Sequence, residues 1–100
     1  MYIYNVTVSI DKSVHDEWLK WMKEKHIPDV MNTNCFVENR LLKVMNEEDH
    51  GLTYSFQYTF KEMKEYEKYQ KEFAPALQAD VKKRYEGKFA AFRTLLEIIE

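Results

Sequence analysis

The clearest pattern in the chain is residues 52–60, LTYSFQYTF, where apolar or aromatic side chains alternate with polar ones. Successive side chains of a strand point to opposite faces of its sheet, so this alternation predicts a strand with one apolar and one polar face. The start of the chain repeats the pattern, since Tyr4, Val6 and Val8 alternate with polar residues. Two such strands predict a sheet that packs one face on a core and leaves the other face open.

A helix is predicted to follow the first of these strands. Ser13 is a capping residue, and the apolar residues behind it, Trp18 among them, form one stripe at helical spacing. The helix is expected to stop near His26, because Pro28 disfavours the helical conformation of the residue before it. Residues 29–34 are then expected to form a loop or a short turn.

A second helical region is predicted after residue 60. Thr59 and Glu62 have the spacing of a capping box, and a further apolar stripe follows them. Pro75 either kinks this region or opens a new helix at its first position. Gly87 is a natural stop, because glycine readily adopts the left-handed conformation that ends many helices.

Two more strands complete the pattern. Residues 35–45 and 89–99 are rich in apolar residues, although helix competes for the second stretch, and Gly51 suits the turn before the strand at 52–60. The order is then β-α-β-β-α-β, the ferredoxin-like arrangement, in which two helices cover one face of a four-stranded antiparallel sheet. We therefore expect an α+β fold with a single ferredoxin-like domain over residues 1–100, a length that supports one core.

The uncovered face of this sheet is the predicted interface. The side chains assigned to the helix side are Tyr4, Val6, Val8, Tyr54, Phe56, Tyr58, Phe92, Leu96 and Ile98. The opposite set has a polar centre with apolar residues toward the last strand, which suits a contact between two copies of the chain. We expect a homodimer that buries Ile3, Leu95 and Ile99. Arg93 falls in the same set and is expected to form an intersubunit ion pair or to bind an anion.

Composition excludes several classes of protein. A dinucleotide-binding or phosphate-binding loop needs several closely spaced glycines, and the chain has only 2. The single cysteine, Cys35, excludes an internal disulfide and indicates no role of its own. The net charge of −2 gives no basic surplus for nucleic acid. With no apolar run of membrane-spanning length and no signal-peptide pattern, we expect a cytoplasmic protein without a membrane partner.

Three segments resemble a known family: WLKWMKEKHIPDVM at 18–31, ALQADV at 76–81 and AFRTLLE at 91–97. They are similar to a small bacterial family of about this length, classed as a domain of unknown function within the dimeric α/β barrel superfamily. The resemblance implies ferredoxin-like subunits that pair sheet to sheet. The superfamily includes cofactor-free monooxygenases, haem-degrading enzymes, isomerases and stress proteins, so it selects no chemistry. Its haem degraders use an Asn on the first strand with a Trp and a His; Asn5 matches the first element, but the second helix has no His.

The candidate site lies around the predicted end of the first helix. His26 either transfers a proton or binds a ligand at the mouth of a cleft, or it caps the helix, where an imidazolium faces the helix dipole favourably. The candidate catalytic residues are His26, Trp18 and Tyr4, and the candidate ligand-binding residues are Asn5, Arg93 and Trp21. Trp18 and Trp21 lie at stripe positions, where core packing is the alternative interpretation.

Two functions are therefore expected from different classes. The first is a homodimeric binding or assembly protein with a small apolar or aromatic ligand. The alternative is a small cofactor-independent enzyme, monooxygenase-like or isomerase-like, with a pocket between the first helix and the sheet. We expect no cofactor and no metal, because the carboxylates and His50 at 47–50 cluster in one turn without ligand spacing.

Overall fold

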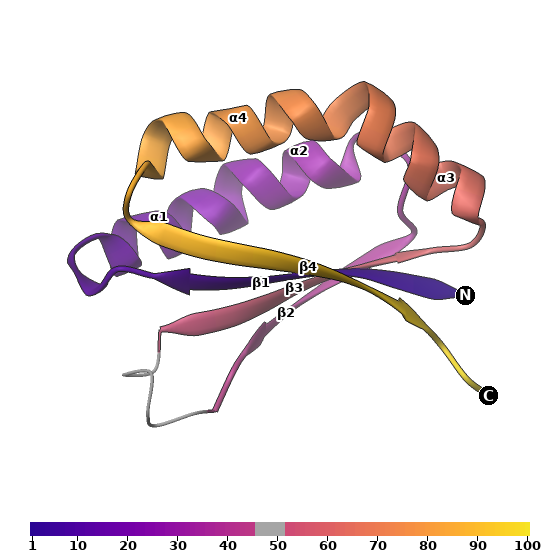
Figure 1. Ribbon diagram of the computed structural model, residues 1–100, viewed down its shortest axis with the longest axis horizontal. Coiled ribbons are helices and arrows are strands. Elements are labelled where there is room, and N and C mark those ends of the chain that lie inside the picture. Colours follow the sequence, from indigo (N-terminus) through magenta and orange to yellow (C-terminus); the bar gives the residue numbers. More distant parts are fainter. Residues whose placement is uncertain (46–51) are drawn as a thin grey trace.

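The computed structural model describes residues 1–45 and 52–100, and the predicted turn with Gly51 lies outside these ranges. Within them, β1 (Tyr2–Ile10), β2 (Glu38–Lys43), β3 (Thr53–Phe60) and β4 (Phe89–Glu97) form one antiparallel sheet in the order β2-β3-β1-β4 (Figure 1). The predicted α+β, ferredoxin-like fold is confirmed. No helix in the described part of the chain has both the length and the apolar character needed to cross a membrane.

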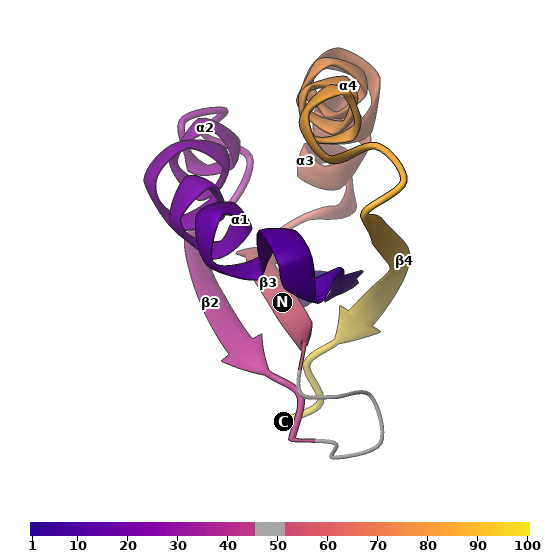
Figure 2. The ribbon, with the colours of Figure 1, turned by 90° about the vertical axis from the view of Figure 1, so that its left-hand side faces the viewer.

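Two helical runs cover the same face of the sheet, as Figure 2 shows. The first run consists of a 3₁₀ turn (Lys12–Val14), α1 (His15–Trp21), a π-helical turn (Met22–His26) and α2 (Ile27–Met31). The second consists of α3 (Met63–Lys68), a π-helical turn (Tyr69–Phe73) and α4 (Ala74–Tyr85). The opposite face of the sheet carries no element among the described residues, and we call it the open face.

The expectation that the first helix stops near His26 is wrong. The run continues to Met31, so residues 29–31 are helical and His26 is not a C-terminal cap. In the π-helical turn the Ile27 N–H donates to the carbonyl of Met22, five residues back. This wider turn relieves the clash that the ring of Pro28 would cause in a regular α-helix.

The second helical run passes its proline in the same way. The Ala74 N–H donates to the carbonyl of Tyr69, again five residues back, and Pro75 is the next residue. Pro75 therefore stands at the start of α4 in a run that continues through it. Gly87 follows the run with φ +76°, as predicted for a helix stop.

Neither predicted helix cap forms as expected. The carboxylate of Asp11 accepts a hydrogen bond from the backbone N–H of Ser13 at 2.8 Å, so Asp11 rather than Ser13 is the capping residue. The Thr59 hydroxyl donates to Glu38, and Glu62 makes no side-chain cap hydrogen bond at α3. A side chain therefore caps the first run only, and at α3 the Glu65 N–H donates to the backbone carbonyl of Glu62 instead.

The predicted faces of β4 are reversed. The register pairs Val6 with Arg93 and Thr7 with Phe92, and paired residues of antiparallel strands lie on the same face. Arg93 therefore lies on the helix side, and Phe92 lies on the open face, where it is 63% exposed. Leu95 pairs with Tyr4 and is also on the helix side, so it does not belong to the open face as predicted. Alternation failed here because β4 carries apolar residues on both faces.

The core lies between the sheet and the helical runs and is mainly aromatic. Its largest fully buried side chains are Trp18, Tyr85, Phe56, Phe60 and Val30. Rings from β1, β3 and both helical runs contact one another across this layer, for example Trp18 edge-on to Phe56 at a centroid distance of 5.7 Å. Such rigid, bulky side chains fix the spacing of helices and sheet, and that spacing positions the cavity described next.

Candidate functional site

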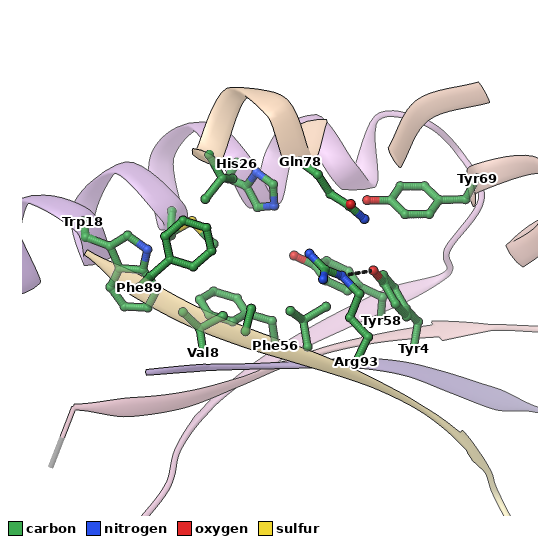
Figure 3. A pocket seen from close by; sticks show the side chains of 14 residues that line it. Tyr4, Val8, Trp18, His26, Phe56, Tyr58, Tyr69, Gln78, Phe89 and Arg93 are labelled. Carbon is green, nitrogen blue, oxygen red and sulfur yellow. Dashed lines mark hydrogen bonds between the residues drawn. The ribbon is translucent and has the colours of Figure 1, made fainter. Parts of the chain in front are cut away.

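A cavity of about 60 Å³ lies inside the subunit, between the helical runs and the sheet (Figure 3). It has room for several water molecules or for part of a small ligand. Its lining residues are Tyr4, Val6, Val8, Trp18, Met22, His26, Phe56, Tyr58, Tyr69, Gln78, Val81, Phe89, Ala91 and Arg93. They come from β1, β3, β4 and both helical runs, so the complete fold is needed to form the cavity.

The cavity has an apolar end and a polar end. Around Trp18 the labelled neighbours in Figure 3 are Val8, Phe56 and Phe89. The polar end is formed by Tyr4, Tyr58, Tyr69, Gln78 and Arg93, with His26 above the space between the two ends. This division favours a molecule with an apolar body and a polar group.

Two buried polar groups in the lining have no hydrogen-bond partner among the described residues. They are the hydroxyl of Tyr58, whose side chain is 2% exposed, and the indole N–H of Trp18, which is 0% exposed. An unpaired buried group of this kind costs about 1–3 kcal/mol, and native proteins contain few of them. Both groups would gain a partner from a molecule in the cavity.

Arg93 lies on β4, an edge strand, and extends over the polar end of the cavity (Figure 3). Its Nε donates a hydrogen bond to the hydroxyl of Tyr4 at 3.1 Å. No acidic side chain in the described ranges forms an ion pair with it. The expected intersubunit ion pair across the open face is wrong, because Arg93 lies on the helix side of the sheet.

His26 ends the first π-helical turn and lines the cavity. Burial lowers the pKa of its imidazole from 6.5 to about 4, more than the nearby charges of Asp29 and Asp80 raise it. The ring is therefore neutral at pH 7 and presents one donor and one acceptor nitrogen. Its proton-transfer role stays a prediction.

Tyr58 and Tyr69, two of the three tyrosines at the polar end, keep protonated hydroxyls at neutral pH. Burial raises the pKa of Tyr58 and of Tyr69 above the ordinary value of a phenol. A protonated hydroxyl both donates and accepts one or more hydrogen bonds. The phenols of this cavity therefore bind or orient polar groups rather than carry charge.

Two predicted site residues lie away from the cavity. Asn5 is on the open face, where it donates to Thr7 at 3.1 Å and accepts from Ser55. Trp21 packs outside the lining, stacked on His26 at a centroid distance of 5.8 Å and with the guanidinium of Arg84 5.2 Å from its ring centroid. The structure thus brings together Tyr4, Trp18, His26 and Arg93 and separates Asn5 and Trp21 from them.

The sequence prediction missed three polar residues of the lining, Tyr58, Tyr69 and Gln78. Alternation places Tyr58 on the apolar face of its strand, and Tyr69 falls in the apolar stripe of the second helical region. A tyrosine instead of a phenylalanine at such a position is the available signal, because a buried hydroxyl needs a partner. Gln78 follows the second π-helical turn, which changes the residues that face the sheet after it. Regular helical spacing therefore could not identify Gln78.

The described residues form no metal site, because no three of their His, Cys, Asp or Glu side chains lie close enough together to hold a metal ion. The acidic turn at 47–50 lies outside these ranges. Cys35 is a buried free thiol and does not line the cavity. The chemistry of the cavity is thus that of phenols, an imidazole, an amide and a guanidinium.

This architecture is that of the ferredoxin-like proteins with an internal cavity between helices and sheet. The chain belongs to the family described as "Domain of unknown function (DUF4286)", whose model matches residues 1–99. No curated protein has a matching sequence.

Solved structures with the same fold share little sequence with this chain. A dimeric ferredoxin-like protein from an uncultured marine organism is 12% identical, with a TM-score of 0.70 over 100% of this chain and 96% of the other. HapK from Hahella chejuensis is 8% identical, with a TM-score of 0.73 over 99% and 93%. The heme-degrader MhuD from Mycobacterium tuberculosis, with two hemes bound in its active site, is 15% identical, with a TM-score of 0.71 over 100% and 97%. These likenesses establish the fold.

Haem does not fit the cavity of this chain. The space of about 60 Å³ accommodates a few water molecules or part of a small ligand rather than a porphyrin. Asn5, the residue that resembles the haem degraders' first-strand Asn, lies on the open face. No step through haem is therefore derived for this protein.

Proposed function

We propose that this chain is a cytoplasmic homodimeric binding protein, each subunit of which holds a small apolar or aromatic molecule in its internal cavity. The observation that carries the proposal is the pair of partnerless buried groups, the Tyr58 hydroxyl and the Trp18 indole N–H, in the lining of one space. Buried polar groups without a hydrogen-bond partner destabilise the free protein, so they are expected where a bound ligand supplies that partner. The aromatic rings around Trp18 offer the apolar contacts.

The dimer is supported by the open face. Phe92, Leu96 and Leu42 are exposed apolar side chains on it, with Phe92 63% exposed. Between them the polar centre is hydrogen bonded within the sheet, as Asn5 with Ser55 illustrates, so it can be covered at little cost. A solved structure of the same fold is described as dimeric, which supports a homodimer. Burial of Phe92 and Leu96 replaces the predicted burial of Leu95.

The binding proposal is tested by nuclear magnetic resonance. The two indole N–H signals of Trp18 and Trp21 are assigned with a Trp21→Phe variant, and benzamide and naphthalene are titrated as uncharged probes. A shift of the Trp18 signal with a saturable curve, without a comparable shift of Trp21, supports the proposal. If no probe moves the Trp18 signal, the cavity is a closed packing defect and the proposal fails.

The dimer is tested separately by light scattering, with an expected mass near twice 12.2 kDa. Phe92→Glu places a charge on the open face at its β4 edge, halfway along the strand, and should give the monomer mass. Met63→Glu is the matched control, because Met63 is an exposed apolar residue at the start of α3, on the helix side. A monomer for the wild-type chain at micromolar concentration contradicts the dimer.

A cofactor-independent enzyme is the second candidate, favoured by one observation. His26 is held neutral and lines the same cavity as the phenols of Tyr58 and Tyr69, and a neutral imidazole facing a bound molecule accepts protons. His26→Gln keeps a polar side chain but removes the base. If the wild type turns over a phenolic probe and the variant binds the probe without turning it over, the protein is an enzyme. Equal rates in both proteins contradict this candidate.

A further inference from the structure

The charge around the cavity is unbalanced. Arg93 is the one side chain in its lining with a charge at pH 7, since His26 is neutral and no Asp or Glu is among the lining residues. The acids that act on His26 from the helical runs are Asp29 and Asp80, and Asp29 is already paired with Lys25 at 3.0 Å. Arg93 is itself solvent-exposed, so it presents a hydrated cation at the edge of the cavity that no acidic residue of the lining balances.

Hydrogen-bond donors also outnumber acceptors at this site. The Nε of Arg93 is occupied by Tyr4, which fixes the plane of the guanidinium and leaves its terminal nitrogens without a partner in the described ranges. Guanidinium and indole groups donate and never accept. The hydroxyl of Tyr58, protonated and unpaired, adds a third donor. A ligand with acceptors at the polar end would pair with the Tyr58 hydroxyl and replace water on the exposed guanidinium of Arg93.

The apolar end limits the rest of the ligand. Trp18, Phe56 and Phe89 surround it, and Trp18 meets Phe56 edge-on, with an interplanar angle of 87°. Rigid rings at these positions accept a planar apolar body more readily than a branched one. The volume of about 60 Å³ is smaller than the roughly 150 Å³ that holds benzene in an apolar cavity, so a body of one ring is the upper limit and its entry requires the lining side chains to move.

We infer that the ligand of this cavity is a small organic carboxylate with a planar apolar body, and that Arg93 binds its charge. The inference rests on the binding function proposed above and specifies its ligand class. A carboxylate offers only acceptor sites and matches the fork of a guanidinium with two parallel hydrogen bonds. Its second role is to give the Tyr58 hydroxyl an acceptor, while the ring lies against Trp18.

Benzoate and benzamide are the test probes, because they have the same shape and differ in charge. Their dissociation constants are measured at pH 7 by calorimetry with the full chain, and the Trp18 signal reports where they bind. We expect benzoate to bind at least about tenfold tighter than benzamide, the ratio that a charge-assisted hydrogen bond supplies. Arg93→Gln should remove this preference by weakening benzoate binding far more than benzamide binding, and Arg93→Lys should retain part of it.

Lys43→Gln is the matched control, since it removes one positive charge from β2, the opposite edge strand. It should leave the preference for benzoate unchanged, and circular dichroism confirms that each variant folds. If the two probes bind wild type equally, or if Arg93→Gln keeps the preference, the carboxylate inference is overturned while the cavity remains a binding site. If neither probe nor naphthalene shifts the Trp18 signal, the proposed binding function itself fails.

Discussion

Replacing Tyr58 by Phe should stabilise the protein in the absence of ligand. The hydroxyl is buried, with its side chain 2% exposed, and no described residue pairs with it. Removing an unsatisfied buried hydroxyl while keeping the ring removes a desolvation cost of about 1–3 kcal/mol. Water in the cavity would satisfy part of this cost, so we expect a gain of about 1 kcal/mol, which corresponds to roughly 4–8 °C in the melting temperature of a domain of this size.

Tyr4→Phe is the matched control for this prediction. Tyr4 is also 2% exposed, but its hydroxyl accepts the hydrogen bond from Arg93 at 3.1 Å. Deleting a hydroxyl that has a partner should lower the free energy of unfolding by about 0.5–1.5 kcal/mol. The two variants remove the same atom from equally buried phenols of one cavity, and their effects should have opposite signs.

Urea unfolding followed by circular dichroism measures both differences. All proteins are compared at one concentration, because the unfolding of a dimer depends on it, and the midpoint is interpreted only where the urea dependence is unchanged. With benzoate present the order should change, since Tyr58→Phe loses a donor to the ligand and should bind it about fivefold more weakly. If Tyr58→Phe destabilises the free protein as much as Tyr4→Phe does, the hydroxyl has a partner in the native state and the reasoning is refuted.

Three further predictions follow from the same structure. Burial lowers the pKa of His26 from 6.5 to about 4, so the unfolded chain binds the proton more readily and stability should fall as pH decreases from 6.5 to 4, by about 3 kcal/mol at most. In His26→Gln, the urea midpoint should change less with pH between 6.5 and 4 than it does in the wild type. If the slope is unchanged, another group causes the loss of stability. Gly87→Ala should lower the free energy of unfolding by about 1 kcal/mol, and the melting temperature with it. A φ of +76° strains any L side chain, although nothing lies within 4 Å of the added Cβ. Equal melting temperatures of the two proteins would contradict this. Phe92→Asp should leave benzamide binding intact while it abolishes the dimer in sedimentation, and a simultaneous loss of binding would show that the cavity depends on the partner subunit.

The sequence predicted the elements whose two sides differ strongly in polarity. β1 and β3 lie at the centre of the sheet, with helices over one face, so their alternation identified both the strands and the buried side. β4 is an edge strand with apolar residues on both faces, and alternation assigned Arg93 and Phe92 to the wrong sides. The burial of a strand on both faces depends on its position in the sheet, which pairing partners determine and local sequence does not.

The candidate site was predicted in part for a related reason. His26 and Trp18 were identified because each is chemically distinctive on a helix that had to cover the sheet. Tyr58 and Gln78 were missed because their role depends on which atoms lack a partner, and that is a property of the packed structure. The rule that a proline ends a helix failed at Pro28, because a π-helical turn before it accommodates the ring.

The two π-helical turns also account for the presence of a cavity in so aromatic a core. Each turn ends two residues before a proline, and each contributes lining residues: Met22 and His26 from the first run and Tyr69 from the second. A π-helical turn widens the backbone locally and turns different side chains inward, which interrupts close packing between the helical run and the sheet at that turn. The same device in two separate helical runs, both beside one cavity, indicates that the space is built into the backbone rather than left by poorly fitting side chains. Substitutions of lining side chains should therefore change which molecule the cavity accepts, whereas changes that restore regular α-helix at these turns should close it.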